Sequence, residues 1–310
     1  LIALVTPFTM NCLPRISALR NLLFGVLGSL LLAACSDSGE PQTGEPLRFG
    51  AIPDEKGTDL VARFAPLSAY LSDELGVPVE FVPVDSYEGL IAQFKNGDVQ
   101  LAWFGGLSGV QARAGVEGAR AIAQGVVDPT FVSYFIANVS TGLEPGDEFP
   151  MGLKGHSFTF GSPNSTSGRL MPEHFIREAS GGSPAEFFDS ENNYSGGHDK
   201  TATLVQAGTF DAGALSYLVY DKLVASGQID PEVCRKIWTT PTYVDYNWTA
   251  HPVLLERYGS DFIDRLQTAI VAVDSKELLT AMMRPDGFVP AANSDFAAIH
   301  DLAVRLEFVR

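Results

Sequence analysis

The sequence predicts a fold of the α/β class with two domains. Apolar, strand-like runs alternate with helical patterns along most of the chain, which is typical of mostly parallel sheets flanked by helices. The alternation stops at a loop-like segment, Gly142–Asp147, and then starts again. About 265 residues follow the amino-terminal leader and tether, and this length suits two domains.

The first half of the chain carries three strand-like runs separated by two helical patterns. Glycine and proline at 76–78 and the Asn-Gly-Asp sequence at 96–98 mark where the two helices end. A longer β-rich run, Thr130–Asn138, precedes the loop. We expect strands at Leu47–Ile52, Val79–Val84 and Val99–Phe104, and helices at Thr58–Leu75 and Tyr87–Asn96.

The second half repeats the alternation and predicts a second α/β unit. Residues 261–310 are largely helical, and no strand run follows about Trp248, so we expect this tail to pack on the first unit. Domain 1 is then discontinuous, with residues 46–138 and 245–310, and domain 2 holds residues 139–244. The expected strands are Ser157–Phe160, Phe187–Asp189, Phe210–Leu215 and Cys234–Thr239, and the expected helices are Ser167–Ala179, His198–Ala207 and Tyr217–Ser226.

The amino end has the pattern of an export signal, which predicts removal of residues 1–34. Arg15 and Arg20 precede an apolar run of about 13 residues, and a membrane-spanning helix needs about 20. Met10 is a more natural start than Leu1. The segment Leu32–Cys35 resembles the lipobox of bacterial lipoproteins, which implies that Cys35 is acylated. We therefore expect a lipid-anchored protein of the periplasm or cell envelope, with a buried cysteine at position 35 as the alternative.

The amino-acid composition limits the disulfides that the chain can form and the partners that it can bind. Residues 35–45 are small and polar and predict a flexible tether. Cys12 lies in the leader and Cys35 at the lipid site, so Cys234 has no partner for an internal disulfide. The formal net charge is −16, which disfavours a nucleic-acid partner. It does not exclude an anionic ligand, because local donors and dipoles govern affinity inside a closed site.

Three consecutive hydroxyl residues, Ser165, Thr166 and Ser167, lie where a strand leads into a helix. The first N–H groups of a helix have no partner within the helix, and the positive end of the helix dipole lies there, so the segment predicts an anion site. An ordinary helix cap is the alternative. A glycine-rich turn at 195–197 likewise delivers His198 to the start of another helix, where its ring can donate to an oxyanion. A purely structural histidine is the alternative.

A third segment, Leu101–Ser108, ends a strand of the first unit, which is where open α/β sheets place their ligand crevice. Gly105 and Gly106 allow a close approach of the backbone, and Phe104 or Trp103 can form an apolar wall. A core aromatic followed by a turn is the alternative.

Taken together, these segments resemble the phosphonate-, phosphite- and phosphate-binding periplasmic proteins of ABC importers, which have the type II periplasmic-binding-protein fold. The resemblance covers the chain from Leu47 to about Leu302, and several blocks look especially like a branch labelled as selenate-binding proteins. Its carriers are Ile52–Asp54, Ala102–Gly106, Gly161–Ser162, Ser165–Gly168, Ser195–Asp199, and Thr240–Pro241 with Tyr243, Asp245 and Trp248.

The resemblance implies a binding subunit that holds a small tetrahedral oxyanion between two domains and delivers it to a permease. Two hinge crossovers are implied, near Thr130–Asn138 and near Tyr243–Thr249. The implied partners are an ABC permease and its ATPase, and we expect a monomer. A sensory module for the same anions remains the alternative function.

The resemblance also assigns roles to individual residues. Ser165, Thr166 and Ser167 match the positions that hold the anionic oxygens, and His198 matches a histidine that donates to the same group. Phe104 lies where phosphonate binders commonly have a tyrosine.

At 215–217 this chain has Leu, Ser and Tyr, where aminoalkylphosphonate binders carry an acid for the amine of the ligand. Phosphate, phosphite, selenate or a small alkylphosphonate therefore fits better, with Tyr217 as a further candidate contact. A protonated oxyanion needs an acceptor that a sulfate-like anion does not, and Asp54 can supply one.

Ser165, His198 and Asp199 also invite a catalytic-triad interpretation. A triad needs an acid on the far side of the imidazole, whereas side chains adjacent on one helix turn point in different directions. The sequence also has no Gly-x-Ser-x-Gly or His-Glu-x-x-His motif. We therefore expect no catalytic residue, no metal and no cofactor.

Overall fold

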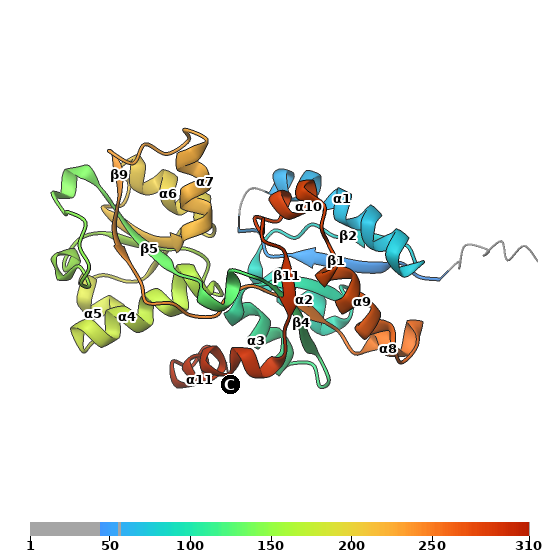
Figure 1. The fold of residues 1–310 in the computed structure, drawn as a ribbon. Helices are drawn as coiled ribbons and strands as arrows, with labels where there is room; N and C mark the ends of the chain where they lie inside the picture. The colour runs from blue at the N-terminus through green and yellow to red at the C-terminus, as the bar shows by residue number, and fades with distance from the viewer. Residues whose placement is uncertain (1–43, 55–56, 310) are drawn as a thin grey trace, which may run out of the picture. The chain divides into compact units, whose positions relative to one another are not determined.

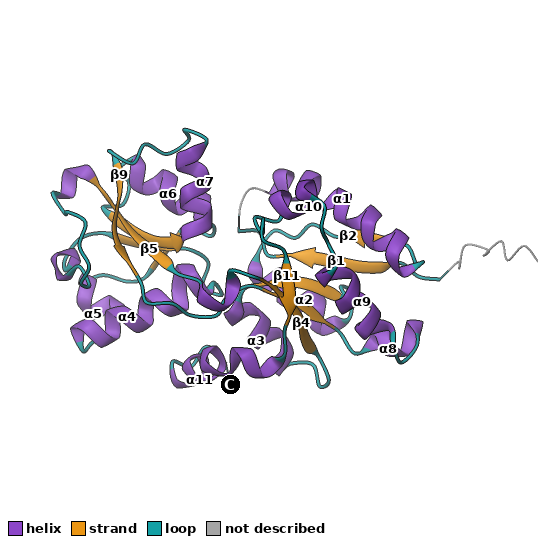
Figure 2. Cartoon of the chain, viewed as in Figure 1, coloured by secondary structure: helices purple, strands orange, loops and turns teal. Residues whose placement is uncertain are grey.

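The protein is represented by a computed structural model that describes residues 44–54 and 57–309. Helices alternate with strands through these residues and flank two separate sheets (Figures 1 and 2). We call the part built on the six-stranded sheet lobe 1 and the part built on the five-stranded sheet lobe 2. The expected export signal, the lipid site at Cys35 and nearly all of the tether lie outside the described residues.

Lobe 1 contains the six-stranded sheet, in the order β11-β4-β10-β3-β1-β2. β1 pairs in parallel with β2 and β3, whereas β10 runs antiparallel to its neighbours β3 and β4. The strands are β1 (Leu47–Ala51), β2 (Val79–Phe81), β3 (Leu101–Phe104), β4 (Arg120–Gly125), β10 (Asn247–Ala250) and β11 (Phe288–Pro290). The helices are α1 (Gly57–Leu75), α2 (Tyr87–Asn96), α3 (Gly106–Ala114), α8 (Val253–Tyr258), α9 (Phe262–Val271), α10 (Lys276–Ala281) and α11 (Ala297–Arg305).

Lobe 2 contains the five-stranded sheet, in the order β7-β6-β8-β5-β9. Phe135 and Ile136 point to opposite faces of β5, and each belongs to a separate buried apolar cluster. Helices therefore cover both faces of this sheet. The strands are β5 (Ser133–Asn138), β6 (Phe158–Phe160), β7 (Asn193–Tyr194), β8 (Ala212–Ser216) and β9 (Cys234–Thr239), and the helices are α4 (Met171–Ser180), α5 (Pro184–Phe188), α6 (His198–Gln206) and α7 (Tyr217–Ala225).

Local sequence explains where several helices begin and end. The side chain of Ser86 accepts from the N–H of Gly89 and caps α2, which ends at Gly97 in the left-handed region (φ 77°). Ser183 and Glu186 form a reciprocal capping box at the start of α5. These caps satisfy backbone groups that the helices themselves leave without partners.

Two crossover segments, residues 126–132 and 240–246, connect the lobes and run side by side. Phe131 and Tyr243 exchange two backbone hydrogen bonds, of 2.8 and 2.9 Å. The N–H of Asp245 donates to the carbonyl of Asp128 over 3.0 Å. Asp128 in turn holds Arg284 in a bidentate ion pair with distances of 2.8 and 2.7 Å, and both side chains are buried. The crossovers are therefore tied to each other and to a buried charge pair.

Most predicted elements are confirmed within a few residues, but three differ. The β-rich run before the loop yields β5, which pairs with β8 and β9 in lobe 2 and not with the sheet of domain 1, where we placed it. The expected strand at Phe187–Asp189 is wrong, because Pro184–Phe188 forms α5 and the strand follows at Asn193–Tyr194. The tail also contains a strand, β11, which pairs with the edge of β4.

Candidate oxyanion-binding site

The loop Ser165–Ser167 leads from β6 into a helix, as the sequence predicts. The Oγ of Ser165 accepts from the N–H of Gly168 over 3.0 Å and caps one turn of π-helix, Thr166–Leu170, which continues as α4. All three hydroxyl residues are buried. The N–H groups of Thr166 and Ser167 belong to the first turn, so the helix leaves them without a partner. They are donors for an anion at the positive end of the helix dipole.

His198 lies against this loop because residue 168 is a glycine. A Cβ at Gly168 would lie 3.2 Å from Cε1 of His198 and 3.0 Å from Oγ of Ser165, closer than nearly all real Cβ contacts. The ring of His198 is buried, and its Nδ1 accepts from the N–H of Ser216 over 3.3 Å. A neutral imidazole with an accepting Nδ1 carries its proton on Nε2. This geometry makes Nε2–H the donor of His198.

Lobe 1 reaches the same loop through the start of α3. Gly105 caps this helix, and the N–H of Leu107 donates to Oγ1 of Thr166 over 3.0 Å. The backbone N–H of His198 donates across the lobes as well, to the carbonyl of Asp54 over 3.1 Å. The binding loop and His198 of lobe 2 are thus in direct contact with lobe 1.

Asp245 is a site residue to which the sequence analysis gave no ligand role. Its Oδ1 accepts from the N–H of Gly106 over 2.9 Å, and the side chain of Thr166 also hydrogen-bonds to it. Its Oδ2 is buried and has no hydrogen-bond partner among the described residues. Burial raises the pKa of Asp245 to about 7, while hydrogen bonds from Thr166 and Gly106 act in the opposite direction. In the sequence, Asp245 stood out only as one of the residues between 240 and 248 that carry the family resemblance.

Two further groups join the site without having been predicted. Tyr87, the first residue of α2, is 1% exposed and hydrogen-bonds to the side chain of Ser165. Burial raises the pKa of Tyr87 well above its usual value, so the hydroxyl stays protonated and can donate. The Oγ of Ser216, next to His198, is buried and has no partner among the described residues. Buried polar atoms of this kind call for a ligand or a water.

The other three predicted site residues, Asp54, Phe104 and Tyr217, each have contacts within the protein. Oδ2 of Asp54 accepts from the hydroxyl of Tyr246 over 3.2 Å, and its Oδ1 lies 3.9 Å from Nη1 of Arg63. The ring of Phe104 packs against Phe94 at 5.6 Å in the core of lobe 1. The ring of Tyr217 packs against Phe131 in a crossover at 4.8 Å.

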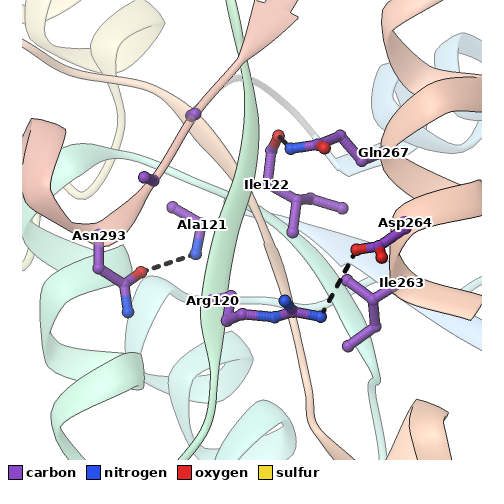
Figure 3. Close-up of a pocket in the computed structure, with 9 residues that line it drawn as sticks. Arg120, Ala121, Ile122, Ile263, Asp264, Gln267 and Asn293 are labelled. Atoms are coloured by element: carbon purple, nitrogen blue, oxygen red, sulfur yellow. Dashed lines mark hydrogen bonds and ion pairs between the residues drawn. The ribbon is translucent and has the colours of Figure 1, made fainter. Parts of the chain in front are cut away.

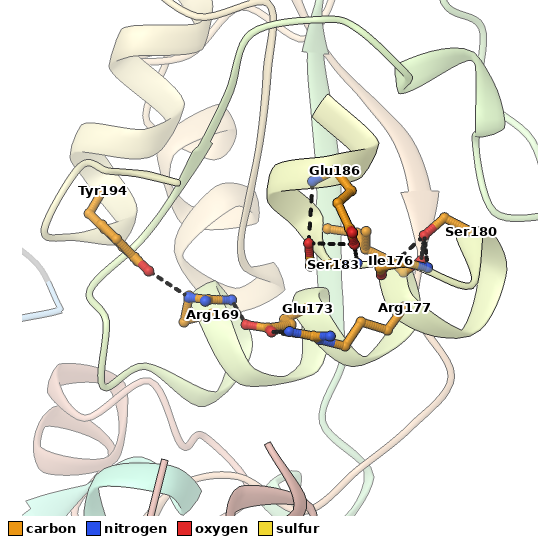
Figure 4. Close-up of polar contacts among 9 residues, drawn as sticks. Arg169, Glu173, Ile176, Arg177, Ser180, Ser183, Glu186 and Tyr194 are labelled. Atoms are coloured by element: carbon orange, nitrogen blue, oxygen red, sulfur yellow. Dashed lines mark hydrogen bonds and ion pairs between the residues drawn. The ribbon is translucent and has the colours of Figure 1, made fainter. Parts of the chain in front are cut away.

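Arg169 follows the loop, and its guanidinium makes a hydrogen bond and an ion pair within lobe 2. Its Nε donates to the hydroxyl of Tyr194 over 2.9 Å, and its Nη1 forms an ion pair with Glu173 (Figure 4). Glu173 also pairs with Arg177 over 2.6 Å. Figure 4 shows this chain of charges running along α4, beside the Ser183–Glu186 cap of α5. Arg169 therefore stabilises the helix that carries the loop.

A separate pocket in lobe 1 is lined by polar groups that already pair with one another or with the backbone. Its volume is about 240 Å³, and it lies between β4, α9 and the segment after β11 (Figure 3). Its polar groups are paired: Arg120 with Asp264 at 4.0 Å, Asn293 with the N–H of Ala121 at 2.8 Å, and Gln267 with the carbonyl of Ile122 at 2.6 Å. These contacts leave few groups that a ligand could use.

Comparison with known proteins decides the family. A profile described as "ABC transporter, phosphonate, periplasmic substrate-binding protein" matches residues 49–296. The chain belongs to this family. It is 36% identical over 296 residues to a probable ABC transporter phosphite binding protein of Prochlorococcus marinus, covering 94% of this chain and 99% of the relative. It is 32% identical over 261 residues to a phosphate-import protein of Mycolicibacterium smegmatis, covering 77% of each.

A solved structure agrees with this family membership. The Prochlorococcus marinus protein in complex with methylphosphonate matches with a TM-score of 0.80 and 37% sequence identity, over 84% of this chain and 98% of that chain. The match confirms the two-domain periplasmic-binding-protein fold. The chain is thus a periplasmic substrate-binding protein of the ABC phosphonate-transporter family, and not an enzyme.

The described residues contain no helix long and apolar enough to cross a membrane. Within the same ranges, no group of three or more His, Cys, Asp or Glu residues is arranged to hold a metal ion.

Proposed function

We propose that Thr166, Ser167 and His198 bind a small tetrahedral oxyanion between the two lobes. The observation that carries the proposal is that buried donors converge with two buried polar atoms, Oδ2 of Asp245 and Oγ of Ser216, for which the described residues supply no hydrogen-bond partner. The donors are the first-turn N–H groups of Thr166 and Ser167, Nε2–H of His198 and the hydroxyl of Tyr87. Charge-assisted hydrogen bonds of this kind are about twice as strong as neutral ones.

The ligand is a bare oxyanion or a small alkylphosphonate. The Prochlorococcus marinus relative is named for phosphite and solved with methylphosphonate, the Mycolicibacterium smegmatis relative is named for phosphate import, and all three ligands are tetrahedral. Ser216, the last residue of β8, lies where aminoalkylphosphonate binders carry an acid for the amine of their ligand. Its hydroxyl can instead donate to an anion. Selenate remains the ligand suggested by the resemblance to one branch of the family.

The paired crossovers act as the hinge of the binding protein. Closure brings the N–H of Leu107 to Thr166 and the carbonyl of Asp54 to the N–H of His198, so both contacts depend on the relative position of the lobes. Domain 1 and domain 2 correspond in this proposal to lobe 1 and lobe 2, and β5 belongs to domain 2. The closed form is the one that a permease and its ATPase would receive.

Anchoring follows from the sequence. Removal of residues 1–34 and acylation of Cys35 would tether a monomer to the membrane through residues 35–45, next to its permease. Labelling of expressing cells with an alkyne fatty acid tests this, because the label should be lost in Cys35→Ser and retained in Cys234→Ser.

The site itself is tested by calorimetry with methylphosphonate, phosphite and phosphate. Hydrogen bonds to charged groups contribute about 1.5–3 kcal/mol, so Tyr87→Phe and His198→Ala, which each remove one of these side-chain donors, should each weaken binding about ten- to a hundredfold, with an unchanged circular dichroism spectrum. Ser183→Ala removes a hydroxyl from an exposed cap of the same lobe and is the control. Wild-type affinity in both site variants would refute the site.

A further inference from the structure

Another pocket lies at the seam between the two lobes, lined by residues that the proposed oxyanion site does not use. Its volume is about 610 Å³, which is within the range of small-molecule sites in proteins. One wall comes from α7 of lobe 2, and the other comes from α1 and from the end of α10 in lobe 1. We call it the seam pocket, and its main lining residues are Ala62, Arg63, Leu218, Lys222, Met283 and Pro285.

The two walls of the seam pocket pack reciprocally on the opposite lobes. Leu218 of lobe 2 packs against the core of lobe 1, and Met283 of lobe 1 packs against the apolar cluster beneath α6 and α7 of lobe 2. Met283 also has a φ of 53°, in the left-handed region that residues with a side chain rarely adopt. Such a conformation persists only where the surroundings hold it. The pocket therefore has this shape only while the lobes keep this relative position.

The lining of the seam pocket combines apolar surface with basic groups. Lys222 is exposed at the edge, whereas the side chain of Arg63 is mostly buried and lies 3.9 Å from a carboxylate oxygen of Asp54. None of the described residues that line the pocket is acidic, although the chain has 37 acidic and 21 basic residues. A ligand with an apolar body and one anionic head matches this arrangement, with its body between the lobes and its head beside Lys222.

The size of the pocket favours a small molecule over a protein partner. Eight described residues line it, whereas a stable protein interface involves about 20–30 residues on each side. The apolar part of the lining accommodates an unbranched chain, and burial of each CH₂ group of such a chain is favourable.

Both walls also adjoin contacts that hold the lobes together. Arg63 lies beside Asp54, whose carbonyl accepts from the N–H of His198. The residue after Met283 is the arginine that pairs with the first crossover. A ligand that touches both walls adds contacts that only this arrangement of the lobes offers, so it binds the closed form more tightly than the open form. By linkage, it raises the affinity for the oxyanion by the same factor by which the oxyanion raises its own.

We propose that the seam pocket binds a small organic anion with an unbranched apolar chain, of the medium-chain carboxylate class, and that its occupation favours closure of the lobes. The binding does not depend on the proposed oxyanion site, whereas the effect on closure rests on it. No covalent step is involved. The carboxylate faces Lys222, and the chain lies against Leu218 and Met283 and displaces water from both walls.

The test is calorimetry with butanoate, hexanoate and octanoate, first in the absence of any oxyanion. Each buried CH₂ group contributes about fourfold in affinity, so binding should tighten along the series. Octanol, which has the chain without the charge, should bind less tightly than octanoate. In the presence of saturating octanoate, methylphosphonate should bind more tightly, and saturating methylphosphonate should tighten octanoate binding by the same factor.

Two variants locate the ligand in the seam pocket. Ala62 is exposed, so Ala62→Glu adds an acid to the wall, which should repel octanoate but not octanol. Ala69→Glu makes the same change at an exposed position of α1 outside the pocket and is the matched control. Lys222→Met should weaken octanoate binding up to about fivefold, the range of an exposed ion pair, and Lys154→Met should not.

Octanoate that fails to bind the wild type would overturn the proposal and leave the groove to a protein segment. Displacement of octanoate by methylphosphonate would also overturn it, because octanoate would then occupy the oxyanion site. Equal loss in Ala62→Glu and Ala69→Glu would show that octanoate binds elsewhere. Two ligands that bind without affecting each other would overturn the effect on closure. If the wild type binds octanoate but no oxyanion, the proposed function fails and the seam pocket stands.

Discussion

Replacement of Phe308 by alanine tests how contacts outside the binding loop contribute to affinity. Phe308 packs against the core of lobe 1, and the guanidinium of Arg169 in lobe 2 lies 5.2 Å from the centre of its ring. Gln111 of α3 donates to the carbonyl of Phe308 over 3.0 Å and accepts from Asn164 over 2.9 Å. Asn164 and Arg169 flank the binding loop on its two sides. The carboxyl-terminal tail therefore touches lobe 2 beside the proposed oxyanion site.

The size of the effect follows from the burial of this contact. A cation over an aromatic ring contributes about 0.5–1 kcal/mol when exposed and about 2 kcal/mol when desolvated. Arg169 is buried and Phe308 is half-buried, so we expect about 1–2 kcal/mol. Opening of the proposed hinge breaks the contact, so its loss lowers the closed fraction and the apparent affinity. This corresponds to a five- to thirtyfold weaker Kd, by the relation that about 1.4 kcal/mol is tenfold.

The assay is stopped-flow measurement of methylphosphonate dissociation together with calorimetry. Phe308→Ala should raise the dissociation rate by that factor and leave the association rate almost unchanged, because most affinity changes lie in dissociation. Phe308→Leu keeps apolar packing but loses the contact with the cation. Its dissociation rate should therefore lie between those of the wild type and Phe308→Ala. Val304→Ala, on the exposed side of α11, is the control. Equal dissociation rates for Phe308→Ala and Val304→Ala would show that the tail does not contribute to closure.

Three further predictions concern stability and ligand choice. Arg284→Met leaves Asp128 as an uncompensated buried charge, which costs about 3–5 kcal/mol and should lower the Tm by about 6 °C or more; an unchanged melting curve would contradict this. Gly168→Ala should weaken methylphosphonate binding in calorimetry because the new methyl group displaces His198. Stability from the raised pKa of Asp245 is fully present below the ordinary pKa of 3.8 and is lost as pH rises to about 7, so Asp245→Asn should gain Tm relative to the apo wild type over this range and gain nothing more above it.

The alternation of elements was readable from the sequence because helices and strands differ in period. The exceptions have local reasons. The run from Thr130 to Asn138 crosses between the lobes without a change in composition, so its pattern does not show which sheet it joins. Phe187 and Phe188 form an apolar run that is too short to distinguish a strand from one helical turn. In the structure the segment is a helix, and the capping box at Ser183 stabilises its start. β11 is a three-residue edge strand without an alternating pattern.

The sequence pointed to members of the proposed site only where the relevant residues are adjacent in the chain. The hydroxyl residues at a helix start and His198 after glycines carry their signals in adjacent positions. Asp245 and Tyr87 come from a crossover and from another helix, and only the fold brings them to the loop. Phe104 follows Trp103 in β3, and successive side chains of a strand point to opposite faces. Phe104 accordingly packs on Phe94, whereas Trp103 stacks on Tyr246 beside Asp54.

A crystal structure of the protein with methylphosphonate tests the central claim most directly. The account predicts that phosphonate oxygens lie within about 3 Å of the N–H groups of Thr166 and Ser167 and of Nε2 of His198, with a further oxygen facing Oδ2 of Asp245. An anion bound elsewhere, or one that contacts the loop while Oδ2 of Asp245 turns to another partner, would contradict it.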